Sequence, residues 1–432
     1  MGRLGIAVAA IVAVALLTAG MWQFGLHLDD YFMLRAHGWA ELRRVWHGTW
    51  DTGQVWPDYY RPLAVWANAA TFAITGFNVG ALHIVVWVEL VVMASLLGLF
   101  IRRELRSDIA GMFAAGLVIV QPAATASLGW YFQQNHRWAS IFFIAALLLW
   151  QRRRHTASAA AWWPIHLAVL AGCLFKEDVI VAEPVLIAWQ WMRARWIGDV
   201  PAPPARMVAV MAGGCAAAAL AHVWALGDVG AEIGGRAVGL DGIARELVRN
   251  LYVGLIRFRD MHTATSGMQR TASALTALVW LGAIAAVGKG HTAGAMLVGQ
   301  GITLAFAAAL TMVVAAPWYM RHHVIAMGGV MIASGCLCLI TELERGRWLA
   351  RSTGCALLAA CLLASRGNLL SYGPCSDKTL SDDAQMIDWI GMPPAPEFRR
   401  LPQWFDLKFQ MCETGDRQHI NDAFRRWATE PR

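Results

Sequence analysis

The sequence predicts an all-α polytopic membrane protein with about 11 helices that cross the bilayer. Hydrophobic residues make up 57% of the 432 residues and charged residues only 15%, a balance too apolar for a soluble protein of this length. Many of the apolar runs approach the roughly 20 residues that a membrane-spanning helix needs. The chain also contains 22 tryptophans, and tryptophan concentrates at membrane–water interfaces.

The first apolar run, residues 4–24, is predicted to be an uncleaved membrane helix. It exceeds the roughly 7–15 apolar residues of a signal-peptide core. With a cytoplasmic N-terminus, this helix delivers the segment "HLDDYF" to the outer face. Residues 28–60 mix aromatic residues with Arg and His, which predicts interfacial helices that lie along the membrane. Residues 61–76 are too short to span and are expected to be half-inserted or interfacial.

Arginine clusters set the direction of the later helices. The run 79–100 leads into "IRRELR", and another span leads into "QRRRH" at 151–155. Because such clusters anchor the cytoplasmic ends of membrane helices, both ends are predicted to be cytoplasmic. The remaining spans alternate in direction and are predicted at 109–128, 137–151, 160–175, 179–192, 206–226, 271–287, 292–314, 324–340 and 348–364.

Three regions follow from this pattern. Residues 1–200 form a transmembrane module with the first outer loop, and residues 201–366 form a second, variable module with an outer loop at 227–270. Residues 367–432 turn polar and are expected to form a small soluble tail on the outer side. Two cysteines in this tail, Cys375 and Cys412, predict a disulfide in an oxidising compartment, the alternative being two free thiols in a small core.

The formal net charge of +7 does not predict nucleic-acid binding. The arginines stand in short clusters between apolar runs and form no basic stripe with interleaved aromatic residues. We therefore expect a membrane protein without a nucleic-acid partner.

Ionisable residues outside the arginine clusters gather on the predicted outer face. Charged groups at membrane depth are costly and usually functional, with ordinary outer-loop charge as the alternative. The set consists of Asp29, Asp30, Arg61, Lys176, Glu177, Asp178, Arg321, His322 and His323.

This set favours a group transfer at the outer face. One carboxylate would act as a general base on an acceptor hydroxyl. The cations would hold a phosphate leaving group, which needs no protonation. A pair of glycosidase carboxylates is a poorer interpretation of Asp29 and Asp30, because adjacent residues usually point apart. The set therefore indicates a transferase with a lipid-phosphate donor.

Metal binding is the competing use of part of this set. Asp29, Asp30, His322 and His323 supply oxygen and imidazole ligands. Adjacent ligands without wider spacing are a weak pattern, and the sequence contains no H-E-x-x-H, C-x-x-C or Walker-type loop. We expect no cofactor and no metal, with a divalent metal as the alternative.

Four motifs, "LDDYF", "YYRPL", "GFNVGALH" and "FKED", occur in this order within residues 1–200. In order and spacing they resemble the GT-C superfamily of membrane glycosyltransferases, especially its protein O-mannosyltransferase-like group. They are also similar to bacterial aminoarabinose and lipopolysaccharide sugar transferases. The resemblance implies a GT-C-like bundle in the bacterial inner membrane, with a periplasmic active site and C-terminus. It further implies inverting transfer of a sugar from a polyprenyl phosphate to a glycan, lipopolysaccharide or protein acceptor.

The resemblance also implies roles for individual residues. Asp29 is the expected catalytic base, and Asp30 is expected to orient or bind the acceptor. Arg61 is expected beside the donor phosphate or bracing its loop. Lys176 is the expected phosphate partner, and Arg321 is a further candidate for that phosphate.

Further substrate contacts are expected around these residues. His136 and Arg137 are either acceptor contacts or interfacial anchors. Glu89 and Glu183 lie inside predicted spans, where a carboxylate needs a partner or must be neutral. The aromatic residues Trp56, Tyr59, Tyr60, Trp130 and Tyr131 form either a sugar platform or an interfacial belt. The remaining candidates for substrate binding are Tyr60, Glu177, Asp178 and His322.

The alternative function is transport, as a transporter or flippase of a lipid-linked or charged substrate. Transporters tend to have internal repeats and ionisable residues near the midplane of the membrane. Here the charges gather at one interface and the sequence has no visible repeat, which favours the enzyme. The expected partners are a polyprenyl-phosphate sugar, its acceptor and membrane lipids.

Overall fold

The computed structural model describes residues 37–48, 60–76, 78–121, 134–156, 158–226, 292–314, 322–341 and 346–372. Every regular element in these residues is an α-helix or a 3₁₀-helix, which confirms the all-α prediction. The elements are α3 (Trp39–Arg44), α4 (Pro62–Thr75), α5 (Val79–Leu105), α6 (Asp108–Val120), α8 (Gln134–Arg153), η3 (Ala159–Trp162), α9 (Trp163–Phe175), η4 (Glu177–Val181), α10 (Ala182–Trp196), α11 (Ala205–Leu226), α14 (Ala293–Val314), α15 (His322–Thr341) and α16 (Gly346–Tyr372). The predicted span 4–24, the predicted span 271–287 and the predicted tail lie outside the described residues.

Local sequence explains where several helices begin and end. The Asn78 side chain accepts a hydrogen bond from the amide of Ala81 and starts α5, and Ser107 caps α6 through the amide of Ala110. The predicted span 109–128 is longer than α6, which ends at Val120 because Gln121 precedes a proline and is extended. Helix α16 runs to Tyr372, beyond the predicted end at 364, since no proline interrupts this part of the chain.

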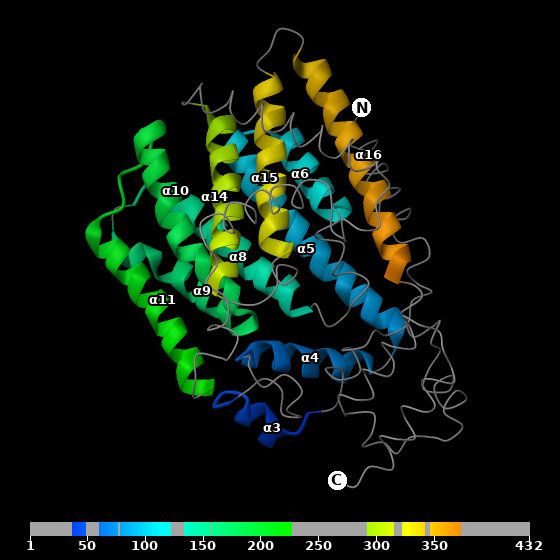
Figure 1. The fold of residues 1–432 in the computed structure, drawn as a ribbon, viewed down its shortest axis with the longest axis vertical. Coiled ribbons are helices and arrows are strands. Elements are labelled where there is room, and N and C mark those ends of the chain that lie inside the picture. The colour runs from blue at the N-terminus through cyan, green and yellow to red at the C-terminus, as the bar shows by residue number, and fades with distance from the viewer. Residues whose placement is uncertain are drawn as a thin grey trace.

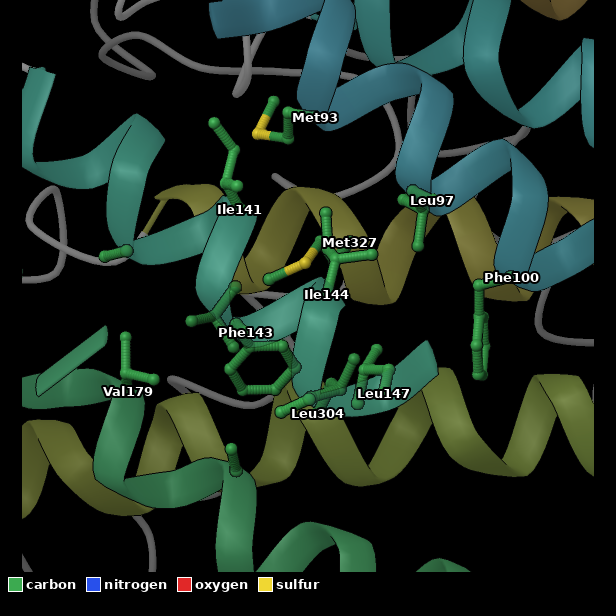
Figure 2. Close-up of a cluster of buried hydrophobic side chains, with 14 of the residues drawn as sticks. Met93, Leu97, Phe100, Ile141, Phe143, Ile144, Leu147, Val179, Leu304 and Met327 are labelled. Atoms are coloured by element: carbon green, nitrogen blue, oxygen red, sulfur yellow. The ribbon is translucent and has the colours of Figure 1, made fainter. Parts of the chain in front are cut away.

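The centre of the bundle is a closely packed apolar core. Helices α5, α8, α14 and α15, together with η4, contribute side chains to this core (Figure 2). The core residues labelled there are Met93, Leu97, Phe100, Ile141, Phe143, Ile144, Leu147, Val179, Leu304 and Met327.

Helices α14 and α15 pack through facing glycines. A Cβ atom on Gly301 would lie 2.6 Å from the carbonyl oxygen of Gly328, and one on Gly335 would lie 2.7 Å from that of Gly294. The lack of side chains at these four positions therefore allows the two backbones to approach closely.

Helix α4 lies across one end of the bundle, and α3 lies beyond it (Figure 1). The Trp66 indole donates to the carbonyl oxygen of Leu42 at 3.0 Å, and the Tyr60 hydroxyl donates to that of Trp46 at 3.2 Å. These bonds hold the segment of α3 against α4. The segment 61–76, which the sequence predicts to be too short to span, forms the helix α4 and runs crosswise to its neighbours.

Length and composition single out one helix in the described ranges as able to cross a membrane, Gly80–Leu105. Shorter apolar helices accompany it at Pro62–Thr75, Asp108–Val120, Ala160–Phe175, Ala205–Ala216, Ala293–Ala307 and Ala326–Thr341.

Candidate functional site

Three segments that are distant in the sequence meet at the end of the bundle that carries α4. They are Arg61 just before α4, the first turn of α8, and residues 176–178, where α9 ends and η4 begins. Two contacts join them, one between Arg61 and Glu177 and one between Lys176 and His136. The structure thus brings together several residues that the sequence selected separately.

Arg61 and Glu177 form a two-pronged ion pair. The guanidinium donates from Nε to Oε2 at 2.8 Å and from Nη2 to Oε1 at 2.6 Å. Arg61 is buried, whereas the Glu177 side chain is 35% exposed. Burial raises the pKa of the Glu177 carboxyl, but the charge and hydrogen bonds of Arg61 outweigh it and hold this pKa well below its ordinary value. Glu177 is therefore ionised at neutral pH, and the pair braces the start of α4 against η4.

Lys176 is buried at the C-terminal end of α9. Its extended backbone ends the helix, and its amide donates to the carbonyl oxygen of Gly172. The Nζ atom lies 3.2 Å from Nε2 of His136 and 3.8 Å from a carboxylate oxygen of Asp178. When Lys176 carries its charge, its ammonium group has only donors, and Nε2 of His136 is the acceptor of this contact.

The first turn of α8 consists of four consecutive buried polar residues, Gln134, Asn135, His136 and Arg137. Such a turn is unusual at the start of an apolar helix, because each buried polar group requires a partner. The side-chain oxygen of Asn135 accepts from the backbone amide of His136. The "QNHR" sequence itself was a usable signal, although only its last two residues were selected from the sequence.

Glu89 of α5 is the partner that the first turn of α8 requires. It accepts from Nε of Arg137 at 2.6 Å and from Nε2 of Gln134 at 2.7 Å. Gln134 Nε2 also contacts the Thr71 hydroxyl of α4 at 3.1 Å. Three helices therefore meet in one buried polar network, in which Gln134 and Thr71 were not anticipated from the sequence.

A second buried pair joins α9 to α10. Nδ1 of His166 lies 2.8 Å from a carboxylate oxygen of Glu183, and the Cys215 thiol of α11 contacts the other oxygen at 3.5 Å. Glu183 thus has the partner that its position inside a predicted span requires. In the parts of the chain that the structure describes, no group of three or more His, Cys, Asp or Glu side chains is arranged to hold a metal ion.

Several predicted site residues are not part of this geometry. His322 is the first residue of α15, and Tyr60 is buried just before Arg61. Asp29, Asp30, Arg321, Cys375 and Cys412 lie outside the described residues, as do the aromatic residues Trp56, Tyr59, Trp130 and Tyr131.

Comparison with protein-family models, with curated proteins and with solved structures finds no match to this chain. A function must therefore be argued from the chemistry of the residues themselves.

Proposed function

We propose that this chain is an inverting membrane glycosyltransferase that uses a polyprenyl-phosphate sugar. The observation that carries the proposal is the assembly of Arg61, His136, Lys176 and the half-buried Glu177 into one polar cluster at one end of the bundle. Arg61, Lys176 and Glu177 belong to the motifs "YYRPL" and "FKED", and His136 is a candidate acceptor contact or interfacial anchor at the start of α8. Their convergence is what a site built from those motifs requires.

The distribution of exposed side chains supports a location in a bilayer. Helix α5 exposes Ile84, Val88 and Val91, which follow one another by about one helical turn and share a face. Helix α9 exposes Trp163, Leu167 and Leu170 in the same way. Polar groups such as those of Glu89 and Arg137 are meanwhile buried between helices. Apolar side chains outside and paired charges inside suit a polytopic bundle in lipid.

The proposed reaction assigns a separate task to each group. Asp29 removes the proton of the acceptor hydroxyl, and Asp30 orients the acceptor. The Lys176 ammonium faces the phosphate of the donor, whose negative charge increases as the sugar leaves. His136 and the Arg61–Glu177 pair hold this cation and its loop in position. The phosphate leaves without protonation, and the sugar is inverted because the acceptor attacks from the opposite side.

Transport of a lipid-linked or charged substrate is the second candidate. The observation that favours it is the buried His166–Glu183 pair between α9 and α10, since ionisable pairs inside a bundle also occur along substrate or proton pathways. Such a pair has no task in the proposed glycosyl transfer.

Single-turnover consumption of a panel of polyprenyl-phosphate sugars by the purified chain tests the proposal. We expect transfer by the wild type with an extract of candidate acceptors. We expect loss of transfer in Asp29→Asn with donor binding retained, and weakened donor binding in Lys176→Met with partial recovery in Lys176→Arg.

The control variant is Arg102→Gln, an exposed cation in the last turn of α5. It should transfer at the wild-type rate. Absence of both transfer and donor binding for every sugar would overturn the enzyme. In that case, uptake of labelled substrate into proteoliposomes that depends on Glu183 would establish the transporter.

A further inference from the structure

The end of the bundle opposite α4 has a fixed ionic centre. Glu104 near the end of α5 accepts from Arg154 after α8, from Nη1 of Arg193 in α10 at 2.6 Å, and from Gln151 at 2.7 Å. All four side chains are buried. Arg193 also pairs with Asp199 in the loop that follows α10. The C-terminal ends of three helices are therefore joined at this end.

Three further helices begin at the same end. Helix α6 follows α5 after a two-residue turn, and α16 runs parallel to α6, because Gly354 lies beside Phe113 and Ser365 donates to the carbonyl oxygen of Val120. Helix α11 begins after the loop of Asp199. Five helix ends near the Glu104 centre, together with the start of α16, thus form one surface.

Arginines dominate this surface. Asp108 and Asp199 are the exposed carboxylates that the structure describes here, and each pairs with an arginine. Several exposed arginines have no ion pair in the described part of the chain. We call them the arginine rim, and they are Arg103, Arg106, Arg152, Arg195, Arg206, Arg347 and Arg351. The rim therefore carries an excess of positive charge.

Large apolar side chains lie directly beside the rim. Trp191 of α10 and Trp348 of α16 are 56% and 74% exposed, and Ile109 of α6 is 62% exposed. A nucleic-acid site would place aromatic residues within a polar, basic surface. Here the basic ends continue into apolar helix faces, an arrangement that matches a phospholipid with an anionic headgroup and acyl chains.

We propose that the arginine rim binds anionic phospholipid headgroups and selects them over zwitterionic ones. The inference depends on the membrane location in the proposed function, and it does not depend on glycosyl transfer. Glu104 and Asp199 pair with the buried residues Arg154 and Arg193, so the exposed arginines of the rim are available to lipid phosphates. The selectivity arises from the negative charge of the lipid and not from its phosphate alone.

Native mass spectrometry of the detergent-solubilised full chain tests the proposal. The probes are dioctanoyl phosphatidylglycerol, dioctanoyl phosphatidylcholine and inorganic phosphate. We expect adducts with phosphatidylglycerol at concentrations where the other two probes give none. The double variant Arg103→Gln/Arg152→Gln should weaken phosphatidylglycerol binding by about 25-fold, at about fivefold for each arginine.

The matched control is Arg43→Gln/Arg44→Gln, which removes two exposed arginines of α3 near the other end of the bundle. This variant should retain wild-type binding. If the first variant fails to fold, Arg195→Gln/Arg206→Gln removes two arginines from α10 and α11 and should show the same loss.

Equal binding of the two lipids, equal binding of inorganic phosphate, or an equal loss in the α3 control would each overturn the proposal. A chain recovered in the membrane fraction that shows no lipid preference refutes this inference and leaves the proposed enzyme intact. A preference for phosphatidylglycerol without sugar transfer or donor binding supports the arginine rim and refutes the proposed enzyme.

Discussion

The buried ion pair between Glu89 and Arg137 gives a direct test of how the bundle is held together. The two side chains are 5% and 1% exposed, and they join α5 to α8 at 2.6 Å. We consider Glu89→Gln, Arg137→Met and the double variant. Glutamine keeps an oxygen that accepts from Gln134, and methionine keeps much of the length and volume of arginine.

Each single substitution leaves the opposite charge buried without its counter-ion. Breaking a buried pair in this way costs about 3–5 kcal/mol of unfolding free energy. The double variant removes both charges, and replacing a whole buried pair by neutral groups is often close to neutral. The double variant should therefore be more stable than the sum of the two losses predicts, with a coupling free energy of at least about 2 kcal/mol.

Reversible unfolding in mixed micelles of dodecyl maltoside and dodecyl sulfate, followed by tryptophan fluorescence, measures the four stabilities of this cycle. The chain contains its own control in Arg102–Asp108, a pair whose side chains are 58% and 63% exposed. The same cycle with Arg102→Met and Asp108→Asn should give a coupling below about 1 kcal/mol, because solvent screens exposed pairs.

Additive losses at Glu89 and Arg137 would refute the reasoning. They would mean that the two charges are stabilised independently, and that the network does not hold α8 against α5. A coupling at Arg102–Asp108 as large as that of the buried pair would contradict it equally, because burial would then not be the cause.

Two further predictions concern packing and pH. Gly301→Val should destabilise the chain by about 2 kcal/mol or more, because its side chain would meet the backbone of Gly328. Gly213→Ala in α11 has open space and should be neutral or stabilising by up to about 1 kcal/mol. Thermal unfolding of both variants measures the difference. Burial raises the pKa of Asp199, but the hydrogen bonds and charge of Arg193 outweigh this effect and hold the pKa below its ordinary value. The Asp199–Arg193 pair stabilises the fold above the unfolded-state pKa of Asp199, and this stabilisation is lost as the pH falls through the lower native pKa. In a plot of melting temperature against pH, Asp199→Asn should therefore reduce the fall between about pH 5 and 2. An unchanged acid limb would mean that other carboxylates control acid unfolding.

Most helix positions were predictable from the sequence because apolar runs and arginine clusters mark them. The spans expected at 160–175, 292–314 and 324–340 correspond to α9, α14 and α15 within a few residues. Errors occur where local chemistry ends a helix early, as at Gln121 before a proline, or where nothing ends it, as in the last turns of α16. The 3₁₀-helix η4 was not predicted, because its five residues have no distinct sequence pattern.

The partners of the buried charges were not predictable. "RRELR" and "QRRRH" have the composition of exposed anchors, and most of their arginines are exposed. Glu104 and Arg154 in the same two clusters are nevertheless buried against each other. Sequence gives the order of residues along a helix but not its rotation about its axis, and the rotation decides which member of a cluster faces the core.

The buried pairs have a further consequence for the proposed location in a bilayer. Lipid tails are as apolar as leucine, so burial of apolar surface there cannot select which helices become neighbours. Charged and polar pairs can select neighbouring helices, because an unpaired charge in an apolar environment is costly. Glu89–Arg137 and Glu104–Arg154 join the middle and the C-terminal end of α5 to the two ends of α8, and His166–Glu183 joins α9 to α10. A register shift of α8 along α5 would break both of the first two pairs at once, so these pairs fix the position at which the first turn of α8 presents His136 to Lys176.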